Sequence, residues 1–175
     1  VFYSSTSHVY PFQKKKIKET YKLKPVSKYG KTKLLAENYL RKKFIKAKIN
    51  FCVGRIFSIY DNKNNGFIIP NLKKKLKQNK KNLVLKYLNH YRDFLNTKQI
   101  SKIIFFLWKK RYFGVINIGS GVKTNLKFVA KIFSKKLNKK VSFINNKPTL
   151  HIADITKLRK LGYKQSKLNT GRFFN

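Results

Sequence analysis

The chain has 175 residues, of which 42% are hydrophobic and 15% aromatic, so it has enough apolar material for a packed interior. This composition excludes a charged, disordered tail. A net charge of +38 ordinarily indicates nucleic acid or an anionic membrane as partner. The lysines, however, run from Lys14 to Lys167 without forming a separate basic block, and a Lys, Asn, Ile, Phe and Tyr excess is typical of AT-rich coding sequences. We therefore expect no specific nucleic acid partner, although a basic nucleic-acid-binding domain stays open as an alternative.

The lone cysteine, the short apolar runs and the first ten residues make a cytoplasmic location the default expectation. Cys52 cannot form an internal disulfide, and its neighbours Phe51 and Val53 predict a buried strand thiol. The longest apolar run, residues 103–108, is far shorter than a membrane span, and the first ten residues lack signal-peptide features. We expect no membrane partner. Because the chain begins at Val1 and contains no methionine, we also expect a fragment or a processed piece.

Strand and helix patterns alternate along the chain, which is typical of an α/β fold with parallel strands. Residues 1–3 predict the end of a strand that enters a polar loop, and residues 14–24 predict a charged loop. Ser27 is expected to cap a helix, and residues 50–56 to form a buried strand. The apolar residues that recur at helical spacing along that helix are Ala36, Leu40, Phe44 and Ala47.

The second half of the chain continues the alternation. Helices are expected at residues 67–76, 98–109 and 126–137, and strands at residues 83–87, 91–95, 114–118 and 141–144. In the helix at 126–137 the expected core residues are Phe128, Ile132 and Phe133. A final helix is expected to be capped by Asp154, to run through Leu161 and to end at Gly162.

A tyrosine and a lysine, Tyr29 and Lys33, stand four residues apart near the start of the first helix, so their side chains share one face. In a chain this rich in both residue types such a pair also arises by chance, with a solvated helix face as the alternative. The surrounding sequence is more specific. Upstream a strand ends in Ser4-Ser5-Thr6-Ser7-His8, and downstream lies Gly54-Arg55-Ile56-Phe57-Ser58.

This order resembles the extended short-chain dehydrogenase/reductases, the NAD-dependent epimerase/dehydratase family that remodels nucleotide-activated sugars. Further matches are Arg92-Asp93-Phe94, residues 115–121, residues 153–155 and Leu161-Gly162-Tyr163. The resemblance implies the second half of a doubly wound parallel-sheet (Rossmann-like) domain with a small α/β substrate-binding lobe. We assign residues 1–66 to the Rossmann-like half, and residues 67–175 mainly to the lobe, interleaved with returning strands and helices.

The resemblance also implies roles for individual residues. NAD or NADP is the expected cofactor, a nucleotide-diphosphate sugar the expected substrate, and a homodimer through the Tyr-x-x-x-Lys helix the expected assembly. His90 and His151 have no partners at metal-ligand spacing, so no metal is expected. The expected catalytic residues are Thr6, Tyr29 and Lys33; the cofactor-binding residues are Ser4, Tyr29, Lys33 and Phe57; and the substrate-binding residues are His8, Ser58, Arg92 and Asn117.

The chemistry implied by the resemblance explains why a tyrosine needs such neighbours. Removing a sugar hydroxyl proton while hydride leaves the same carbon requires a base, and free tyrosine, with a pKa of about 10, is almost entirely protonated at pH 7. Lowering that pKa by roughly three units takes about 4 kcal/mol, whereas an exposed ion pair supplies at most about 1 kcal/mol. Lys33 alone is therefore insufficient, and the positive nicotinamide ring is expected to contribute.

Two departures from the family pattern matter for function. No Gly-x-x-Gly-x-x-Gly turn occurs in the chain, so we expect it to bind NAD poorly by itself. Relatives that act as dehydratases carry a carboxylate within two residues of the catalytic threonine, whereas Thr6 is followed by Ser7 and His8. A 4-epimerase or a ketosugar reductase is therefore favoured, with a dehydratase of the same family as the alternative.

Overall fold

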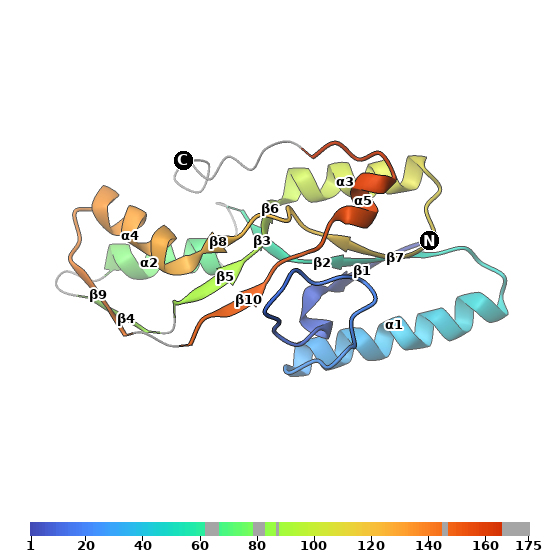
Figure 1. The fold of residues 1–175 in the computed structure, drawn as a ribbon, viewed down its shortest axis with the longest axis horizontal. Helices are drawn as coiled ribbons and strands as arrows, with labels where there is room; N and C mark the ends of the chain where they lie inside the picture. The colour runs from blue at the N-terminus through green and yellow to red at the C-terminus, as the bar shows by residue number, and fades with distance from the viewer. Residues whose placement is uncertain (62–66, 79–82, 87, 145–146, 166–175) are drawn as a thin grey trace.

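A computed structural model describes residues 1–61, 67–78, 83–86, 88–144 and 147–165 of the chain. At its centre is a parallel three-stranded sheet in the order β1 (Phe2–Thr6), β2 (Cys52–Ile56) and β7 (Gly114–Ile118). Helix α1 (Lys28–Lys46) runs along one face of this sheet, and α3 (Thr97–Lys109) and α5 (Thr156–Lys160) lie on the other (Figure 1). This is the expected layered α/β arrangement.

The first hydrophobic core lies between the central sheet and the helices α3 and α5. The predicted buried strand at 50–56 is confirmed, and Cys52 is a buried free thiol, as expected. Burial raises the pKa of this thiol to about 11, so it remains protonated. The main side chains of this core from the two helices and β7 are Ile100, Ile103, Leu107, Leu158, Ile116 and Ile118.

Helix α1 begins as predicted, because the Ser27 hydroxyl accepts a hydrogen bond from the amide of Gly30 at 3.0 Å. Its predicted apolar stripe is only partly correct. Ala36, Leu40 and Phe44 are half-buried and Ala47 is exposed, so none of these four is fully covered. Apart from Gly30, which has no side chain, Glu37 is the only fully buried residue of α1. The helix is therefore held to the sheet through a charge as well as through apolar contacts.

A second hydrophobic core lies in a smaller group of elements beside the central sheet (Figure 1). Its helices are α2 (Ile68–Gln78) and α4 (Leu126–Lys136). The parallel pairs are β3 (Ser58–Tyr60) with β6 (Phe94–Asn96), and β4 (Leu83–Lys86) with β9 (Val141–Ile144). A further sheet has the order β10 (Thr149–His151), β5 (His90–Arg92) and β8 (Thr124–Asn125). We propose that the first core belongs to the Rossmann-like part and the second to the lobe, with α3, α5 and β7 as the elements of residues 67–175 that return to the Rossmann-like part. Residue 66, where the assignment changes, lies outside the described residues.

The single strand predicted at 91–95 is wrong, because the chain forms two strands there that join different sheets. Asp93 separates β5 from β6 and is completely buried. Its carboxylate accepts hydrogen bonds from the backbone amides of Ser120, Gly121 and Ala153, and from the Ser120 hydroxyl. These interactions hold the turn after β7 and the chain before α5 against the β5–β6 junction.

The rotation of helix α4 also differs from the prediction. Phe133 is buried as expected, but Ile132 is only half-buried and Phe128 is 60% exposed. The Asn125 side chain caps the helix by accepting from the Phe128 amide, which fixes where the first turn begins. The residues that face the core are Leu126, Val129, Ala130 and Phe133. The predicted helix is therefore correct, but it is rotated about its axis relative to the prediction.

The predicted polar loop after residue 3 is wrong, because β1 continues through Thr6, where its backbone pairs with β2. Three smaller features complete the comparison with the sequence. The charged loop at 14–24 contains a core residue, Ile17, which is fully buried and bridges to Ala153. The final helix is N-capped by Ile155 without a side-chain bond, although Asp154 accepts from the Thr156 amide, and Gly162 follows it with φ +94 as expected. The predicted strand at 83–87 is β4, but Tyr87 lies outside the described residues.

Candidate active site

The candidate site lies at the carboxyl edge of the central sheet. Thr6 is the last residue of β1 and pairs in register with Ile56, the last residue of β2. A short 3-10 helix, η1 (Ser7–Val9), follows directly, and the Thr6 hydroxyl accepts from the amide of His8 at 3.3 Å. Thr6 is 5% exposed, whereas His8 is exposed. The parallel strands thus deliver a hydroxyl residue and an imidazole to one edge of the sheet.

The amino end of α1 packs closely onto this turn. A Cβ added to Gly30 would lie 2.3 Å from the carbonyl oxygen of His8, so only glycine permits the observed approach. The neighbouring Tyr29 is 55% exposed, and its ring meets the His8 ring edge-on at 5.9 Å between centroids. The His8 ring therefore contacts the Tyr29 ring, and the His8 backbone amide is hydrogen-bonded to Thr6.

Lys33 completes the group from the next turn of α1. Its Nζ donates a hydrogen bond of 2.9 Å to the carbonyl oxygen of Ser4 and lies 5.1 Å from the centre of the Tyr3 ring. Burial, the Glu37 carboxylate and Tyr29 raise the pKa of Tyr3 above its ordinary value. The structure thus gathers five predicted site residues at one place: Ser4, Thr6, His8, Tyr29 and Lys33.

An aromatic group centred on His151 borders these residues. Rings of Phe12 and Phe57 each lie 5.5 Å from the His151 ring, and the His8 ring lies 6.0 Å from it. The Nε2 atom of His151 lies 3.0 Å from the carbonyl oxygen of Ser7, which can only accept, so Nε2 carries the proton. Its Nδ1 atom is buried without a hydrogen-bond partner among the described residues. Sequence reasoning considered His151 only as a metal ligand and missed this place beside the candidate site.

Burial lowers the pKa of three neighbouring side chains, His8, His151 and Arg92. Burial lowers the pKa of His151 to about 4; the hydrogen bond to the Ser7 carbonyl opposes this effect, and Arg92 and His8, when His8 is protonated, add to it. Burial, followed by the charge of Arg92, also lowers the pKa of His8. Both imidazoles are therefore neutral at pH 7.

The remaining predicted site residues come from other elements. Arg92 lies at the end of β5, where its Nη1 atom donates to the carbonyl of Tyr91 at 3.1 Å and to the Thr149 hydroxyl at 3.3 Å. Its guanidinium stacks over Phe12 at 5.2 Å, which places it next to the His151 group. Burial lowers its pKa. Arg92 thus lies near His8, and its role toward a substrate stays a prediction.

Three predicted residues lie in different surroundings. Phe57 is 4% exposed and follows β2, and the half-buried Ser58 donates its amide to the Asp93 carbonyl at 2.9 Å. Asn117 is completely buried in β7, where its side chain accepts from the Tyr10 hydroxyl at 3.0 Å and donates to the Ile17 carbonyl at 2.8 Å. Both polar ends of the Asn117 side chain are occupied inside the protein, and its role toward a substrate stays a prediction.

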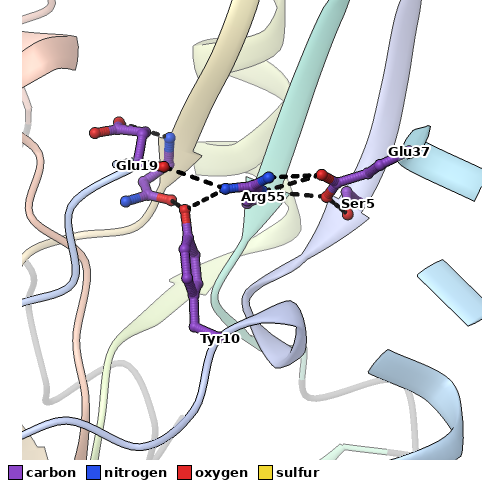
Figure 2. Close-up of polar contacts among 6 residues, drawn as sticks. Ser5, Tyr10, Glu19, Glu37 and Arg55 are labelled. Carbon is purple, nitrogen blue, oxygen red and sulfur yellow. Dashed lines mark hydrogen bonds and ion pairs between the residues drawn. The ribbon is translucent and has the colours of Figure 1, made fainter. Parts of the chain in front are cut away.

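Beneath the candidate site is a buried polar network that sequence reasoning missed (Figure 2). The guanidinium of Arg55 forms an ion pair of 2.7 Å with Glu37, and both side chains are 3% exposed. Its Nη1 atom donates to the Tyr10 hydroxyl at 2.8 Å, and the Ser5 hydroxyl donates to Glu37. The network therefore links β1, β2, α1 and the loop after η1.

An apolar groove of about 820 Å³ lies elsewhere, at the amino end of β1 and along α3. Its walls include Phe2, Trp108 and Tyr112, and none of the predicted site residues. Within the described ranges there is no cluster of three or more metal-ligating side chains. No helix among the described residues combines the length and the apolar character needed to cross a bilayer.

A sequence profile of the NAD dependent epimerase/dehydratase family matches residues 1–119, which include β1, α1, β2 and Arg92. The chain belongs to this family. The matched range contains every residue of the candidate site except His151.

Several solved structures share the fold of this chain. A UDP-N-acetylglucosamine 4-epimerase from Methanobrevibacter ruminantium is 22% identical, with a TM-score of 0.79 over 98% of this chain and 58% of that one. A UDP-glucuronic acid 4-epimerase from Bacillus cereus is 23% identical, with a TM-score of 0.81 over 95% and 56%. A dTDP-glucose 4,6-dehydratase from Streptomyces venezuelae is 19% identical, with a TM-score of 0.83 over 99% and 59%. The predicted Rossmann-like fold class is thereby confirmed, and this chain spans less than two thirds of the length of each of these proteins.

Proposed function

We propose that this chain carries the catalytic and substrate-binding part of an NAD(P)-dependent nucleotide-sugar epimerase or ketosugar reductase. The observation that carries the proposal is the packing of Tyr29 and Lys33 against the carboxyl end of β1. There Lys33 bonds the Ser4 carbonyl, and His8 contacts both Thr6 and Tyr29. These residues also lie within the range matched by the family profile.

In the proposed reaction Tyr29 removes a proton from, or returns one to, a sugar hydroxyl. Its side chain is 55% exposed and so is accessible to a substrate. Lys33 supplies a nearby positive charge that stabilises the phenolate, and the Thr6 hydroxyl donates to the same sugar oxygen. The Lys33 ammonium has three donor hydrogens and uses one for Ser4, which leaves donors for a ribose.

NAD(P) would act as the acceptor and donor of hydride between the two half-reactions. Similar structures are described with NAD or with NADPH bound, as in the Bacillus cereus epimerase and a protein from Pseudomonas aeruginosa. We assign Tyr29, Lys33 and Ser4 to the nicotinamide ribose, and Phe57 to the wall of the nicotinamide site. A ribose fits this donor set, because hydroxyls can accept from Lys33 and donate to a carbonyl. The pyrophosphate needs a glycine-rich turn that these residues do not contain, so we propose that an upstream half supplies it.

The substrate is proposed to be a nucleotide-diphosphate sugar. Arg92 carries a planar fork of donors suited to a diphosphate, and Nη1 is the atom of that fork bonded to other described residues. His8 is exposed beside Arg92 and is assigned to the sugar or its diphosphate. Ser58 and Asn117 are also assigned to substrate binding, which for the buried Asn117 requires it to exchange its present hydrogen bonds with Tyr10 and Ile17.

The acidic residues favour an epimerase or a reductase over a dehydratase. A dehydratase needs an additional proton donor or acceptor next to the threonine hydroxyl. Two buried carboxylates, Glu37 and Asp93, lie close to the strand ends of this sheet, and the half-buried Glu19 accepts from the backbone amide of Asn117. Glu37 is occupied by Arg55 and Ser5, and Asp93 by backbone amides, so neither is free for elimination chemistry.

A homodimer through α1 is part of the proposal. The outward side of this helix exposes Leu35, Tyr39 and Ile45 by 69%, 61% and 67%. Burying such side chains against a second copy is favourable, whereas lysines on the same helix repel their counterparts. We therefore expect a monomer–dimer equilibrium that shifts toward the dimer as salt is added, measured by sedimentation velocity. A dimer unaffected by Leu35→Glu would place the interface elsewhere.

The experiment that tests the function compares variants of the enzyme with its upstream glycine-rich half present. Steady-state turnover of UDP-, GDP- and dTDP-sugars is measured for the parent, Tyr29→Phe and Arg92→Ala. Tyr29→Phe should abolish turnover with little change in sugar binding, whereas Arg92→Ala should chiefly raise KM, through loss of a contact worth roughly 1.5 to 3 kcal/mol. Full activity in Tyr29→Phe would reduce the tyrosine to an ordinary helix residue and remove the centre of the proposal. The chain without the upstream half should show no turnover.

A further inference from the structure

The buried carboxylate of α1 lies on the helix face that carries the proposed catalytic pair. Tyr29, Lys33 and Glu37 follow one another at intervals of four residues, so they stack along a single side of the helix. Exposure falls along this row: Tyr29 is 55% exposed, Lys33 is intermediate and Glu37 is 3% exposed. The row therefore runs from the open candidate site into the interior.

Glu37 meets a polar row that crosses the central sheet. Ser5, Arg55 and Asn117 are register partners on β1, β2 and β7. The Arg55 Nε atom lies 3.1 and 3.2 Å from the two Glu37 carboxylate oxygens, and Nη2 lies 2.7 Å from one of them (Figure 2). The Ser5 hydroxyl donates to the same carboxylate. The Glu37 side chain thus bonds to paired residues on the two adjacent strands β1 and β2.

The far side of the row is fixed as well. The Tyr10 hydroxyl accepts from Arg55 at 2.8 Å and donates to the Asn117 side chain at 3.0 Å. Burial and the neighbouring Arg55 act in opposite directions on Tyr10, and burial prevails, which raises its pKa to about 12. Burial lowers the pKa of Arg55, but its hydrogen bond with Glu37 and the nearby Tyr10 and Glu37 charges more than compensate, so the pKa is raised. The Arg55–Glu37 ion pair is therefore surrounded by hydrogen-bond partners, Tyr10 on the side of Arg55 and Ser5 on the side of Glu37.

The contacts of Glu37 with Ser5 and Arg55 fix the position of α1 along β1. Ser5 sits between Ser4, whose carbonyl accepts from Lys33, and Thr6. A shift of α1 by one turn would move every residue of the row by about 5.4 Å and separate Lys33 from Ser4. We propose that Glu37 and Arg55 are positioning residues, which hold α1 at the height where Lys33 reaches Ser4 and Tyr29 lies beside His8. This inference rests on the proposed function.

A merely stabilising ion pair makes a different prediction. Replacing a buried ion pair with apolar residues of similar volume is often neutral for stability, whereas removing one partner leaves a buried charge uncompensated. The double variant Glu37→Leu with Arg55→Met therefore separates the two roles, because it can fold while lacking the directional contacts. Leu40→Ala is the matched control, since it weakens the packing of the half-buried Leu40 on the same helix without touching the network.

The test uses the enzyme with its upstream half and measures kcat, KM and urea stability for each variant. The double variant should lose about 10- to 100-fold in kcat with KM within about 3-fold of the parent, the size of loss that a small misplacement of catalytic groups causes. Leu40→Ala should lose stability and keep its kcat. In the folded double variant the nuclear Overhauser contact between the Tyr29 and His8 rings should weaken. A parental kcat with a parental ring contact would overturn the inference.

Two further measurements keep the outcomes distinct. If the double variant does not fold, Ser5→Ala, which removes only the hydroxyl that donates to Glu37, decides the question. It should lower kcat several-fold, and a parental kcat in Ser5→Ala would overturn the inference. Tyr29→Phe is measured in parallel: if that variant keeps full activity, the proposed function fails. If it is inactive while the folded double variant keeps its kcat, only the positioning role of Glu37 and Arg55 fails.

Discussion

His151 should make the fold sensitive to mild acid. Its pKa falls from 6.5 to about 4 in the folded chain, so the unfolded chain takes up the proton first as pH decreases. The folded state therefore loses stability as pH falls from about 6.5 toward 4, and the full contribution is present above pH 6.5. At pH 5 this linkage amounts to about 2 kcal/mol. In urea unfolding followed by far-UV circular dichroism, that loss should appear between pH 7.5 and pH 5.

His151→Gln isolates this contribution. The glutamine amide can still donate to the Ser7 carbonyl in place of Nε2, but it does not titrate. The variant should lose about 2 kcal/mol less than the parent between the two pH values. The control is His90→Gln: burial also lowers the pKa of His90, but this side chain is only half-buried and should contribute less. Equal pH dependence in the parent and His151→Gln would refute a buried neutral imidazole at this position.

Three other outcomes can be checked on the same chain. Gly30→Ala should lower the free energy of unfolding in urea by about 1 to 3 kcal/mol, because the added Cβ would collide with the His8 carbonyl. Ser27→Gly leaves this close approach open and should lower it by only about a few tenths of a kcal/mol. Asp93→Asn should cost roughly 2 to 4 kcal/mol, since an amide group would face backbone donors at Ser120, Gly121 or Ala153; an unchanged melting temperature would contradict this. Binding to duplex DNA, followed by fluorescence anisotropy, should be weak, salt-sensitive and independent of sequence, and a tight sequence-selective complex would favour the nucleic-acid alternative.

Much of the fold could be predicted because its signals are local. The Ser27 cap, the strand around Cys52 and the helix that ends at Lys109 each depend on residues within a few positions of one another. Helix α3 even has a complete capping box between Asn96 and Gln99, which sets its start one residue before the predicted one. The structure also brings Ser4, Thr6, Tyr29 and Lys33 together, because the amino end of α1 packs on the end of β1 and the turn after it, while their functional roles stay a prediction.

What sequence could not supply was phase and register. Helix α4 offers apolar residues at several rotations, and the Asn125 cap, not the periodicity, places Val129 and not Phe128 toward the core. The strand predicted at 91–95 reads as continuous because Asp93, which follows the charged Arg92, looks like a solvated residue of a single strand. The four donors that make Asp93 a buried junction come from residues 27 to 60 positions away.

The acidic residues show how a chain of charge +38 keeps a defined interior. All five accept a specific hydrogen bond: Glu37 from Arg55 and Ser5, Asp93 from three backbone amides, Glu19 from the Asn117 amide, Asp61 from the Thr97 hydroxyl and Asp154 from the Thr156 amide. Two of the five, Glu37 and Asp93, are almost completely buried, where a carboxylate is costly unless it is fully bonded. Lysine enrichment on the surface adds repulsion that weakens with salt, whereas these internal acceptors are shielded from it. Inside the protein, the Glu37 carboxylate therefore holds β1, β2 and α1 together, and the Asp93 carboxylate holds the β5–β6 junction.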